Sequence, residues 1–387
     1  MGAETMSDRK YWIWLATVMG AGARTDELFS VYENPKEVYE TSLAERKLTG
    51  IFTPKQLERS ETTKLSDAEN IISVCNKNGW GILTPAMKEY PAGLRKIPDM
   101  PIVLYVDGDI TCVRGKVMIG VVGTRKPCNE SIAIARKICG GLASAGAVVV
   151  SGGALGIDRA AHEGCLESGG KTVCVLGCGL GTRYLLENEA MRRDISRNGA
   201  VISEFPPLFN ANRTTFPVRN RIISGISHGV LVVEAGAKSG SLITAGCAAD
   251  QGRDVFSIPG SVLTTAYAGA NNLIRDGAKA VTCARDILES YAVMYPDRID
   301  LSKAETVTVC EAQTKPKAMK PKVKKELPPD LDGDSIAVYE LFGDEPMHPD
   351  DIAAESGLSL QRVNSALMML EINGLIKQLS GKNYVLN

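Results

Sequence analysis

Patterns typical of buried strands and of helices alternate through the middle of the chain, from Val117 to Ile287. Several β-branched apolar runs are each followed by a glycine-rich turn and then by a helical pattern. Continuous apolar runs separated by helices are typical of parallel strands buried on both faces of a sheet. We therefore predict an α/β fold with a doubly wound parallel sheet and right-handed crossovers. Its strands are expected to start near Val117, Val148, Thr172, Ala200, Val230 and Asp254.

The residues before this core, 1–85, have a helical pattern. An amphipathic segment opens at Tyr11, and Phe52-Thr53-Pro54 is typical of a helix that stops and restarts. The pattern favours a small helical bundle, with a helix-hairpin-helix DNA-binding module as the alternative. Residues 86–112 form a connector in which prolines forbid a helix, and we expect its last run, Pro101–Tyr105, to be an edge strand.

The core is expected to span residues 113–290, and residues 291–329 change character. Lys315–Lys325 contains six lysines, two prolines and no acidic residue. Such a stretch cannot bury a core, so we predict a flexible linker, which could also contact nucleic-acid phosphates.

Residues 330–387 have the pattern of a winged helix. Three helices are expected: Ile336–Phe342, a short helix over Ile352–Ser356 after Pro349, and a third helix capped by Ser359. A hairpin should follow, with its turn at Ser380-Gly381 between Gly374–Ile376 and Tyr384–Leu386.

Charge is balanced overall, with 44 basic and 45 acidic residues, but it is distributed unevenly. From Pro328 onward there are ten acidic and three basic residues, whereas from Arg114 to Glu289 there are 20 basic and 14 acidic residues. A reader of duplex DNA must neutralise phosphates. We therefore expect the winged helix to dock on a protein rather than on duplex DNA.

Composition excludes several other classes of protein. The ten cysteines form no CxxC pair and the three histidines are far apart, so we expect no metal site and no cofactor. The sequence has no signal peptide and no apolar span of membrane length. Cysteines in apolar surroundings indicate a reduced, cytoplasmic protein.

The turns after the predicted strands carry the candidate chemistry. Ligands bind off the carboxyl ends of parallel strands, and backbone N–H groups of glycine turns attract anions. In Gly123-Thr124-Arg125 the backbone and hydroxyl could hold a phosphate and the guanidinium could hold it in a bidentate fork. This turn is neither a Walker A loop nor a GxGxxG fingerprint. The competing interpretation is a tight turn with a solvated Arg125.

The second turn, Ser151-Gly152-Gly153, allows close backbone approach. Asp158 and His162 follow it, four residues apart on one helix face. They could hold a metal or act as a base, but an internal Asp158–His162 hydrogen bond is the favoured interpretation.

The third and fourth elements are Phe216–Arg221 and Lys238–Ser241. In the third, Phe216 could stack on an unpaired base while Arg219 and Arg221 take phosphates; alternatively Phe216 is in the core and Arg219 pairs with Glu234 or Glu204. In the fourth, Lys238, Ser239, Gly240 and Ser241 could bind an anion at a helix N-terminus, cap that helix, or do both.

The ordered series of these motifs resembles the DNA-processing protein A (DprA, also called Smf) family. The resemblance covers about residues 85 to 290 and implies an extended Rossmann fold, with a SAM-like or helix-hairpin-helix-like N-terminal domain and a C-terminal winged helix. It rests on Gly123–Arg125, Ser151–Asp158, Ala161-His162, Ser203-Glu204, Phe216–Arg221, Val233–Ala235, Ser239–Ser241, Thr244-Ala245 and Pro259-Gly260.

The resemblance also implies a function. Members of the family are homodimers that bind single-stranded DNA and load the RecA recombinase during natural transformation. The sequence departs from the family at Leu180-Gly181 and Tyr184-Leu185, so no contact is assigned to that loop. Carried over by residue, the DNA pocket would contain Gly123, Thr124, Arg125, Gly152, Gly153, Phe216, Arg219, Asn220, Arg221, Ser239, Gly240 and Ser241.

Two hypotheses of different classes follow. The first is a non-enzymatic recombination mediator that protects incoming single-stranded DNA and loads RecA. The alternative is a nucleotide-processing enzyme, a hydrolase or phosphoribohydrolase, that uses the same glycine-rich pocket, with Glu234, Asp158 and Glu204 as acid–base groups.

Overall fold

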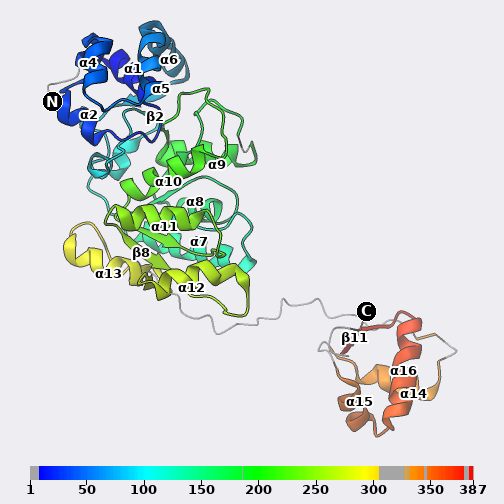
Figure 1. The fold of residues 1–387 in the computed structure, drawn as a ribbon. Coiled ribbons are helices and arrows are strands. Elements are labelled where there is room, and N and C mark those ends of the chain that lie inside the picture. Colours follow the sequence, from blue (N-terminus) through cyan, green and yellow to red (C-terminus); the bar gives the residue numbers. More distant parts are fainter. Residues whose placement is uncertain are drawn as a thin grey trace. The chain divides into compact units, whose positions relative to one another are not determined.

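The computed structural model describes residues 8–184, 186–304, 327–328, 331–343, 347–378 and 383–386. The chain divides into two units, Met1–Thr308 and Val309–Asn387, and each is described by itself (Figure 1). The lysine-rich segment Lys315–Lys325, predicted to be a linker, lies outside the described residues.

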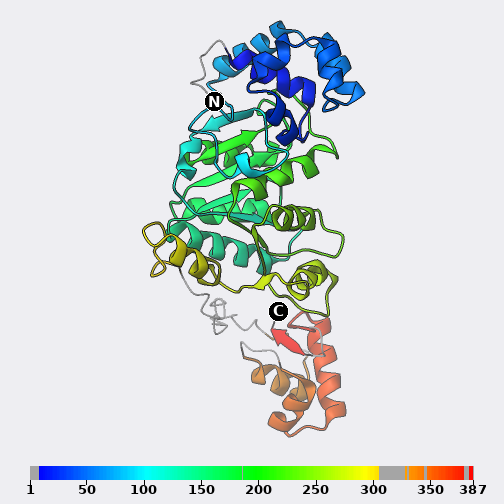
Figure 2. The same ribbon diagram turned by 60° about the vertical axis from the view of Figure 1, so that its left-hand side comes forward.

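The first unit opens with a bundle of short helices. Local capping defines several of them: Ser42 with Glu45 and Thr53 with Gln56 form reciprocal capping boxes. The bundle core contains the fully buried Trp14 together with Tyr105 from the following strand, so the bundle is packed onto the α/β part (Figure 2). The helices are α1 (Arg9–Met19), α2 (Asp26–Val31), α3 (Pro35–Glu40), α4 (Leu43–Leu48), α5 (Pro54–Thr62) and α6 (Leu65–Asn78).

The α/β part is built on one sheet, and the six predicted parallel strands are all present. In the described residues its strand order is β1-β2-β6-β5-β4-β3-β7-β8-β9. The strands are β1 (Gly81–Leu83), β2 (Leu104–Gly108), β3 (Met118–Val122), β4 (Val148–Ser151), β5 (Thr172–Leu176), β6 (Ala200–Ser203), β7 (Gly229–Val232), β8 (Asp254–Ser257) and β9 (Lys279–Ala280).

One strand prediction was wrong. β2 is not an edge strand, because it pairs in antiparallel fashion with β6 on one side and with β1 on the other. Pro101 precedes the paired residues, so it does not interrupt the ladder. The edge belongs to β1, which falls inside the segment that had a helical pattern; three residues are too few to show a period of two.

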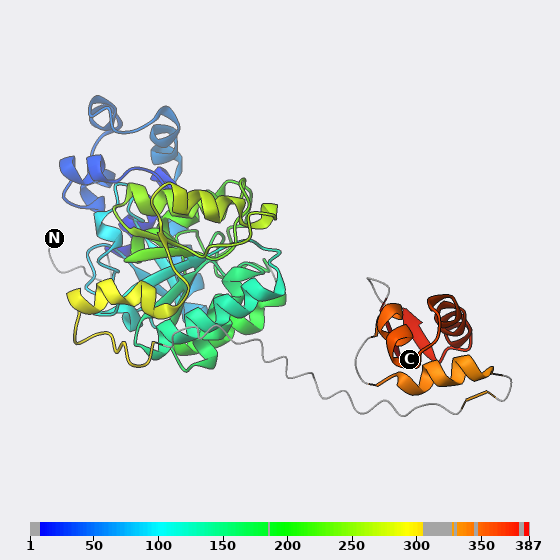
Figure 3. The same cartoon turned by 90° about the horizontal axis from the view of Figure 1, so that it is seen from below.

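Helices cover both faces of the sheet (Figure 3). Ile119 and Val121 of β3 pack with α7, α8 and α13, while Met118 and Val122 pack with α10 and α11. This alternation explains why the strands have continuous apolar runs. The helices are α7 (Asn129–Ser144), α8 (Ile157–Glu167), α9 (Glu189–Asn198), α10 (Thr215–Ile226), α11 (Ser241–Asp250), α12 (Ala268–Arg275) and α13 (Ala284–Met294).

The direction of winding reverses at β3. From β3 the chain adds β4, β5 and β6 on one side, then returns to place β7 and β8 on the other. The strands β3 and β7 are neighbours, and the loops that leave their carboxyl ends run to opposite faces of the sheet. Doubly wound sheets bind ligands in the crevice between two such loops. Beyond α13, Ile299 and Ala304 are buried against the α7 face.

The second unit contains the predicted winged helix. Its elements are α14 (Gly333–Leu341), α15 (Pro349–Ser356), α16 (Leu360–Ile372) and the antiparallel strands β10 (Ile376–Gln378) and β11 (Tyr384–Leu386). α14 begins earlier than expected because Asp332 caps it by accepting from the Ser335 amide. Ser359 does precede α16, but its hydroxyl makes no capping hydrogen bond. The predicted turn Ser380-Gly381 lies outside the described residues.

In the described residues no helix is of a length and apolarity that would let it cross a membrane.

Candidate functional site

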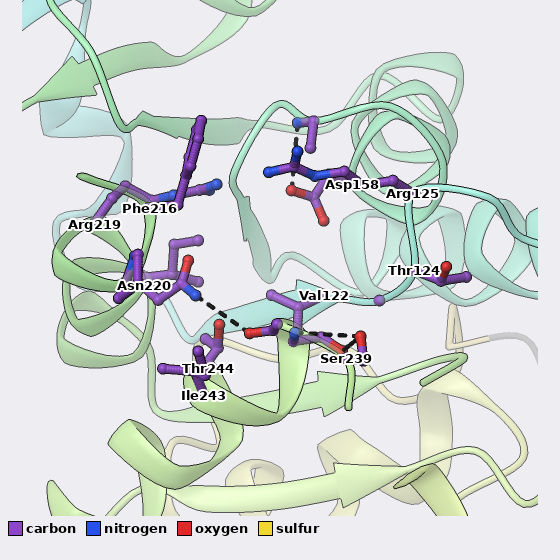
Figure 4. Close-up of a pocket in the computed structure, with 16 residues that line it drawn as sticks. Val122, Thr124, Arg125, Asp158, Phe216, Arg219, Asn220, Ser239, Ile243 and Thr244 are labelled. Atoms are coloured by element: carbon purple, nitrogen blue, oxygen red, sulfur yellow. Dashed lines mark hydrogen bonds between the residues drawn. The ribbon is translucent and has the colours of Figure 1, made fainter. Parts of the chain in front are cut away.

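A cavity of about 370 Å³ lies at the switch point of the sheet (Figure 4). The turn after β3, the start of α8, one side of α10 and the start of α11 form its walls. Nine of the predicted residues line it: Gly123, Thr124, Arg125, Phe216, Arg219, Asn220, Ser239, Gly240 and Ser241.

Glu234 holds the turn after β3 against the loop that follows β7. Its backbone carbonyl accepts from the Thr124 amide at 2.8 Å, and its buried carboxylate accepts from the Cys128 amide at 3.1 Å. Gly123 allows α8 to come close, because a Cβ there would collide with the side chain of Ile157. Two turns that are distant in sequence are thereby fixed on one side of the cavity.

Arg125 lies at the mouth of the cavity. Its guanidinium is exposed and sits over the ring of Phe216, 5.0 Å from the ring centroid. Tyr184 also contacts this ring, with centroids 5.5 Å apart. Stacking of a base on Phe216, as expected from the sequence, therefore requires Arg125 to swing aside. The guanidinium would then remain near the mouth, where a phosphate can reach it.

The floor of the cavity carries a buried pair of opposite charges, Arg219 and Asp158, exposed by 5% and 6%. Arg219 donates from Nη1 to the Val175 carbonyl at 3.2 Å, and its Nε has no hydrogen-bond partner among the described residues. Burial raises the pKa of Asp158, and the positive charge of Arg219 opposes that rise. Burial likewise lowers the pKa of Arg219. The two opposite charges influence each other across the floor, and the exposed cation within reach of a phosphate is Arg125 at the mouth.

The remaining wall comes from the start of α11. Asn220 donates from its side-chain amide to the Gly240 carbonyl at 3.4 Å. The hydroxyls of Ser239 and Ser241 are 2.8 Å apart, and Ser239 also accepts from the Ser241 amide at 3.4 Å. Gly240 is the capping residue and has no side chain to cap with. The start of α11 thus borders the cavity, and its first backbone N–H groups are bonded within the turn: Leu242 donates to the Ser239 carbonyl at 3.1 Å and Ile243 to the Gly240 carbonyl at 3.2 Å.

Four predicted residues do not line the cavity: Gly152, Gly153, Arg221 and Lys238. Gly152 acts indirectly, because a methyl group at that position would overlap the guanidinium of Arg219. Gly153 has a φ of 65°, and a Cβ there would run into the sulfur of Cys174. Lys238 is exposed on the loop before α11.

Arg221 lies on the other side of α10 from Arg219. At 3.6 residues per turn, two positions correspond to about 200° around a helix. The Arg221 Nη2 donates to Glu204 at 2.6 Å, and Nε lies 3.3 Å from an Asp99 oxygen. The internal ion pair foreseen for one arginine of this motif therefore exists, but at Arg221 and not at Arg219.

The hydrogen bond expected between Asp158 and His162 is absent from the described residues. Asp158 instead accepts from the Ala154 amide at 3.3 Å. His162 Nδ1 lies 2.8 Å from the Thr172 hydroxyl, which itself donates to the Val149 carbonyl. Thr172 must therefore accept, which places the imidazole proton on Nδ1. Burial lowers the pKa of His162 to about 3.

Several lining residues were not among the predicted DNA-binding residues, including Ile243 and Thr244, and Asp158, which was named only as a candidate base or metal ligand. Ile243 is 46% exposed although its helix has an apolar pattern. Its position, an apolar residue on the first helical turn after a glycine loop, could have identified it as a lining residue from the sequence. Of the carboxylates named for the enzymatic alternative, Asp158 lines this cavity and Glu204 lines another, while Glu234 accepts from Cys128. In the described residues no group of His, Cys, Asp or Glu side chains could hold a metal ion.

Comparison with known proteins gives consistent matches across the chain. Residues 81–292 match the family described as DNA recombination-mediator protein A, and residues 322–382 match the DprA winged helix domain. Protein Smf from Synechocystis sp. is 33% identical over 98% of this chain and 98% of its own length. DNA processing protein DprA from Bacillus subtilis is 38% identical over 57% of this chain and 74% of its own.

Solved structures agree with these matches. DNA processing protein A from Streptococcus pneumoniae has a TM-score of 0.63 and 33% identity, covering 72% of this chain and 97% of that protein. The Helicobacter pylori protein, whose structure is described as revealing a single-stranded DNA binding mode, has a TM-score of 0.51 and 28% identity, covering 56% and 97%. On its fold, its cavity and these matches, the chain belongs to the DNA recombination-mediator protein A (DprA/Smf) family.

Proposed function

We propose that this chain is a non-enzymatic recombination mediator that binds single-stranded DNA at the cavity between β3, α10 and α11. The convergence of Arg125 and Phe216 at the cavity mouth carries the proposal, since a cation and an aromatic face are the two groups that a flexible single strand requires. The hydroxyls of Ser239 and Ser241 at the start of α11 add a neutral polar wall. The Helicobacter pylori relative is described as binding single-stranded DNA.

The proposal includes a cellular role for the protein. We infer that the protein acts in the cytoplasm as a homodimer, protects incoming strands and loads the RecA recombinase during natural transformation. The family membership of the chain supports this role. We also propose that the acidic winged helix docks on a protein, because in the described residues its exposed apolar residues include Met368 and Ile372 on α16. Duplex DNA would favour cations on that helix.

The test is fluorescence anisotropy with a labelled single strand and the matching duplex across a salt series. We expect a strong preference for the single strand with little dependence on its sequence. Arg125→Ala should weaken binding to all sequences alike and reduce the slope of log K against log salt by about 0.7, as loss of one phosphate contact predicts. Arg193→Ala on α9 removes an exposed cation that does not line the cavity and is the control. Equal binding by wild type and Arg125→Ala would refute the site.

The enzymatic alternative has its own test. Incubation with a panel of mononucleotides should release neither base nor phosphate, because the three candidate carboxylates are not brought together. Release that depends on Asp158 would instead support the nucleotide-processing enzyme.

A further inference from the structure

A second cavity, of about 570 Å³, lies between the helical bundle and the α/β part of the first unit. The end of α1, the side chain of Arg59 from α5 and the segment from Glu204 to Val218 line it. Apolar atoms make up most of its walls. Phe205 and Phe209 stack beside it, with ring centroids 5.2 Å apart and an angle of 23° between the rings. Phe205 is buried, whereas Phe209 is 43% exposed and keeps accessible ring surface.

Helix α10 separates this cavity from the first one. Phe216 and Arg219 face the first cavity, while Thr215 and Val218 face the second. A helix with its side chains is about 10–12 Å across. A strand held at Arg125 therefore needs to extend only a few nucleotides over the N-terminal end of α10 to reach the second cavity.

The charges around the second cavity are suited to a nucleic-acid strand. Among the described residues neither Arg59 nor the exposed Arg213 forms an ion pair. Gly20 makes room for Arg59, because a Cβ at Gly20 would lie 3.0 Å from its Nη1. Glu204 also lines the cavity, and Arg221 forms ion pairs both with it, at 2.6 Å, and with Asp99, at 3.3 Å. A phosphate near Arg59 would meet a cation that is unpaired among the described residues, beside an apolar interior and away from this paired group of charges.

We propose that this cavity accepts a second unpaired base of the strand bound at the first cavity, stacked on Phe209 with its phosphate near Arg59. The inference rests on the proposed function and gives the helical bundle a direct part in binding. A free anion would use the arginines but not the aromatic pair, and an uncharged apolar molecule would use the pair but not the arginines. A nucleotide in a strand uses both, with stacking tolerant of sequence.

The test is a length series of labelled oligothymidylates, from about 4 to about 16 nucleotides, the range over which single-strand sites extend. The variants are Arg59→Ala and Phe209→Leu, which keeps apolar bulk but removes the aromatic face. Controls are Lys47→Ala, an exposed cation of the same bundle, and Leu208→Ala, the 69% exposed neighbour of Phe209.

The expected result separates the two cavities. Both variants should bind the shortest oligomers as wild type does and the longest ones more weakly. For Phe209→Leu the loss should be roughly tenfold, as one stacked base predicts; Arg59→Ala should lose one phosphate contact and with it part of the salt dependence. Variants that follow wild type at every length would overturn the second site. Arg125→Ala is measured in parallel and should lose affinity at all lengths. If it does not, the first site fails, and with it the inference that depends on it.

A measurement on the wild type avoids any question of variant folding. Oligomers carrying 5-iododeoxyuridine at single positions are irradiated in complex with the full chain, and the crosslinked peptides are identified by mass spectrometry. One position should crosslink to the peptide containing Phe205–Phe209, and another to the peptide containing Phe216. Crosslinks to the Phe216 peptide alone, at every position, would contradict the proposal.

Discussion

The guanidinium of Arg219 occupies the space next to Gly152 that any side chain at that position would fill. Gly152 follows β4 and Arg219 comes from α10, so the two are brought together only by the fold. Gly152 does not line the cavity. Gly152 contributes to the site by leaving room for the guanidinium of Arg219.

Substitution of Gly152 should therefore act like a substitution of Arg219. In Gly152→Ala the methyl group displaces the guanidinium from the floor and leaves Asp158 buried without its cation. We expect single-strand affinity to fall to about the level of Arg219→Ala, measured by anisotropy, together with a loss of stability of about 1–3 kcal/mol. Gly246→Ala, on the same unit, meets nothing within 4 Å and should retain full affinity. Retained affinity in Gly152→Ala would show that Arg219 is dispensable.

Arg221 should behave differently from Arg125. Removing one partner of a buried ion pair leaves the other uncompensated, so Arg221→Met should destabilise the protein by about 3–5 kcal/mol in urea unfolding. The double variant Arg221→Met with Glu204→Gln should recover part of that loss, because the buried charge is then gone. If Arg221→Met instead kept its stability and lost single-strand affinity as Arg125→Ala does, Arg221 would be a direct DNA ligand.

His162 gives the fold a defined pH dependence. Its pKa is depressed to about 3 in the folded protein, from an ordinary value of 6.5. Between these values the unfolded chain binds a proton that the native state does not, so stability is full above pH 6.5 and falls as the pH decreases. The slope from this group approaches about 1.4 kcal/mol per pH unit. His162→Asn can still donate to Thr172 but does not titrate, so urea unfolding from pH 4 to 8 should show a shallower slope. An unchanged slope would mean that His162 is already accessible to protons.

The winged helix should be dispensable for single-strand binding. Truncation after Lys325 removes the acidic winged helix, whose Arg362 is already paired with Asp334 at 2.6 Å, and keeps the six lysines of Lys315–Lys325. Affinity for single strands should stay within about twofold, and duplex binding should not fall, because the removed unit has few cations to offer to phosphates. A marked loss of duplex binding on truncation would assign DNA contact to this unit.

Much of the architecture follows from local patterns. The parallel strands from β3 to β8 were predicted because both faces of each are buried, which leaves a continuous apolar run in the sequence. The winged-helix elements were predicted from helical period and capping signals. The very short β1 was missed, and with it the internal position of β2, because Gly81–Leu83 owes its conformation to pairing with β2 and not to its own residues.

The sequence by itself determined the fold class, the winged helix and which turns hold candidate ligand groups, because each depends on a pattern of residues that are close together along the chain. Only the tertiary structure decided which of those groups face the cavity and which form internal ion pairs. Arg219 and Arg221 are two residues apart and look equivalent in sequence, yet α10 turns one toward the cavity and the other toward Glu204. Their roles differ because burial and partners from distant segments, not residue type, determine whether a guanidinium is available to a ligand.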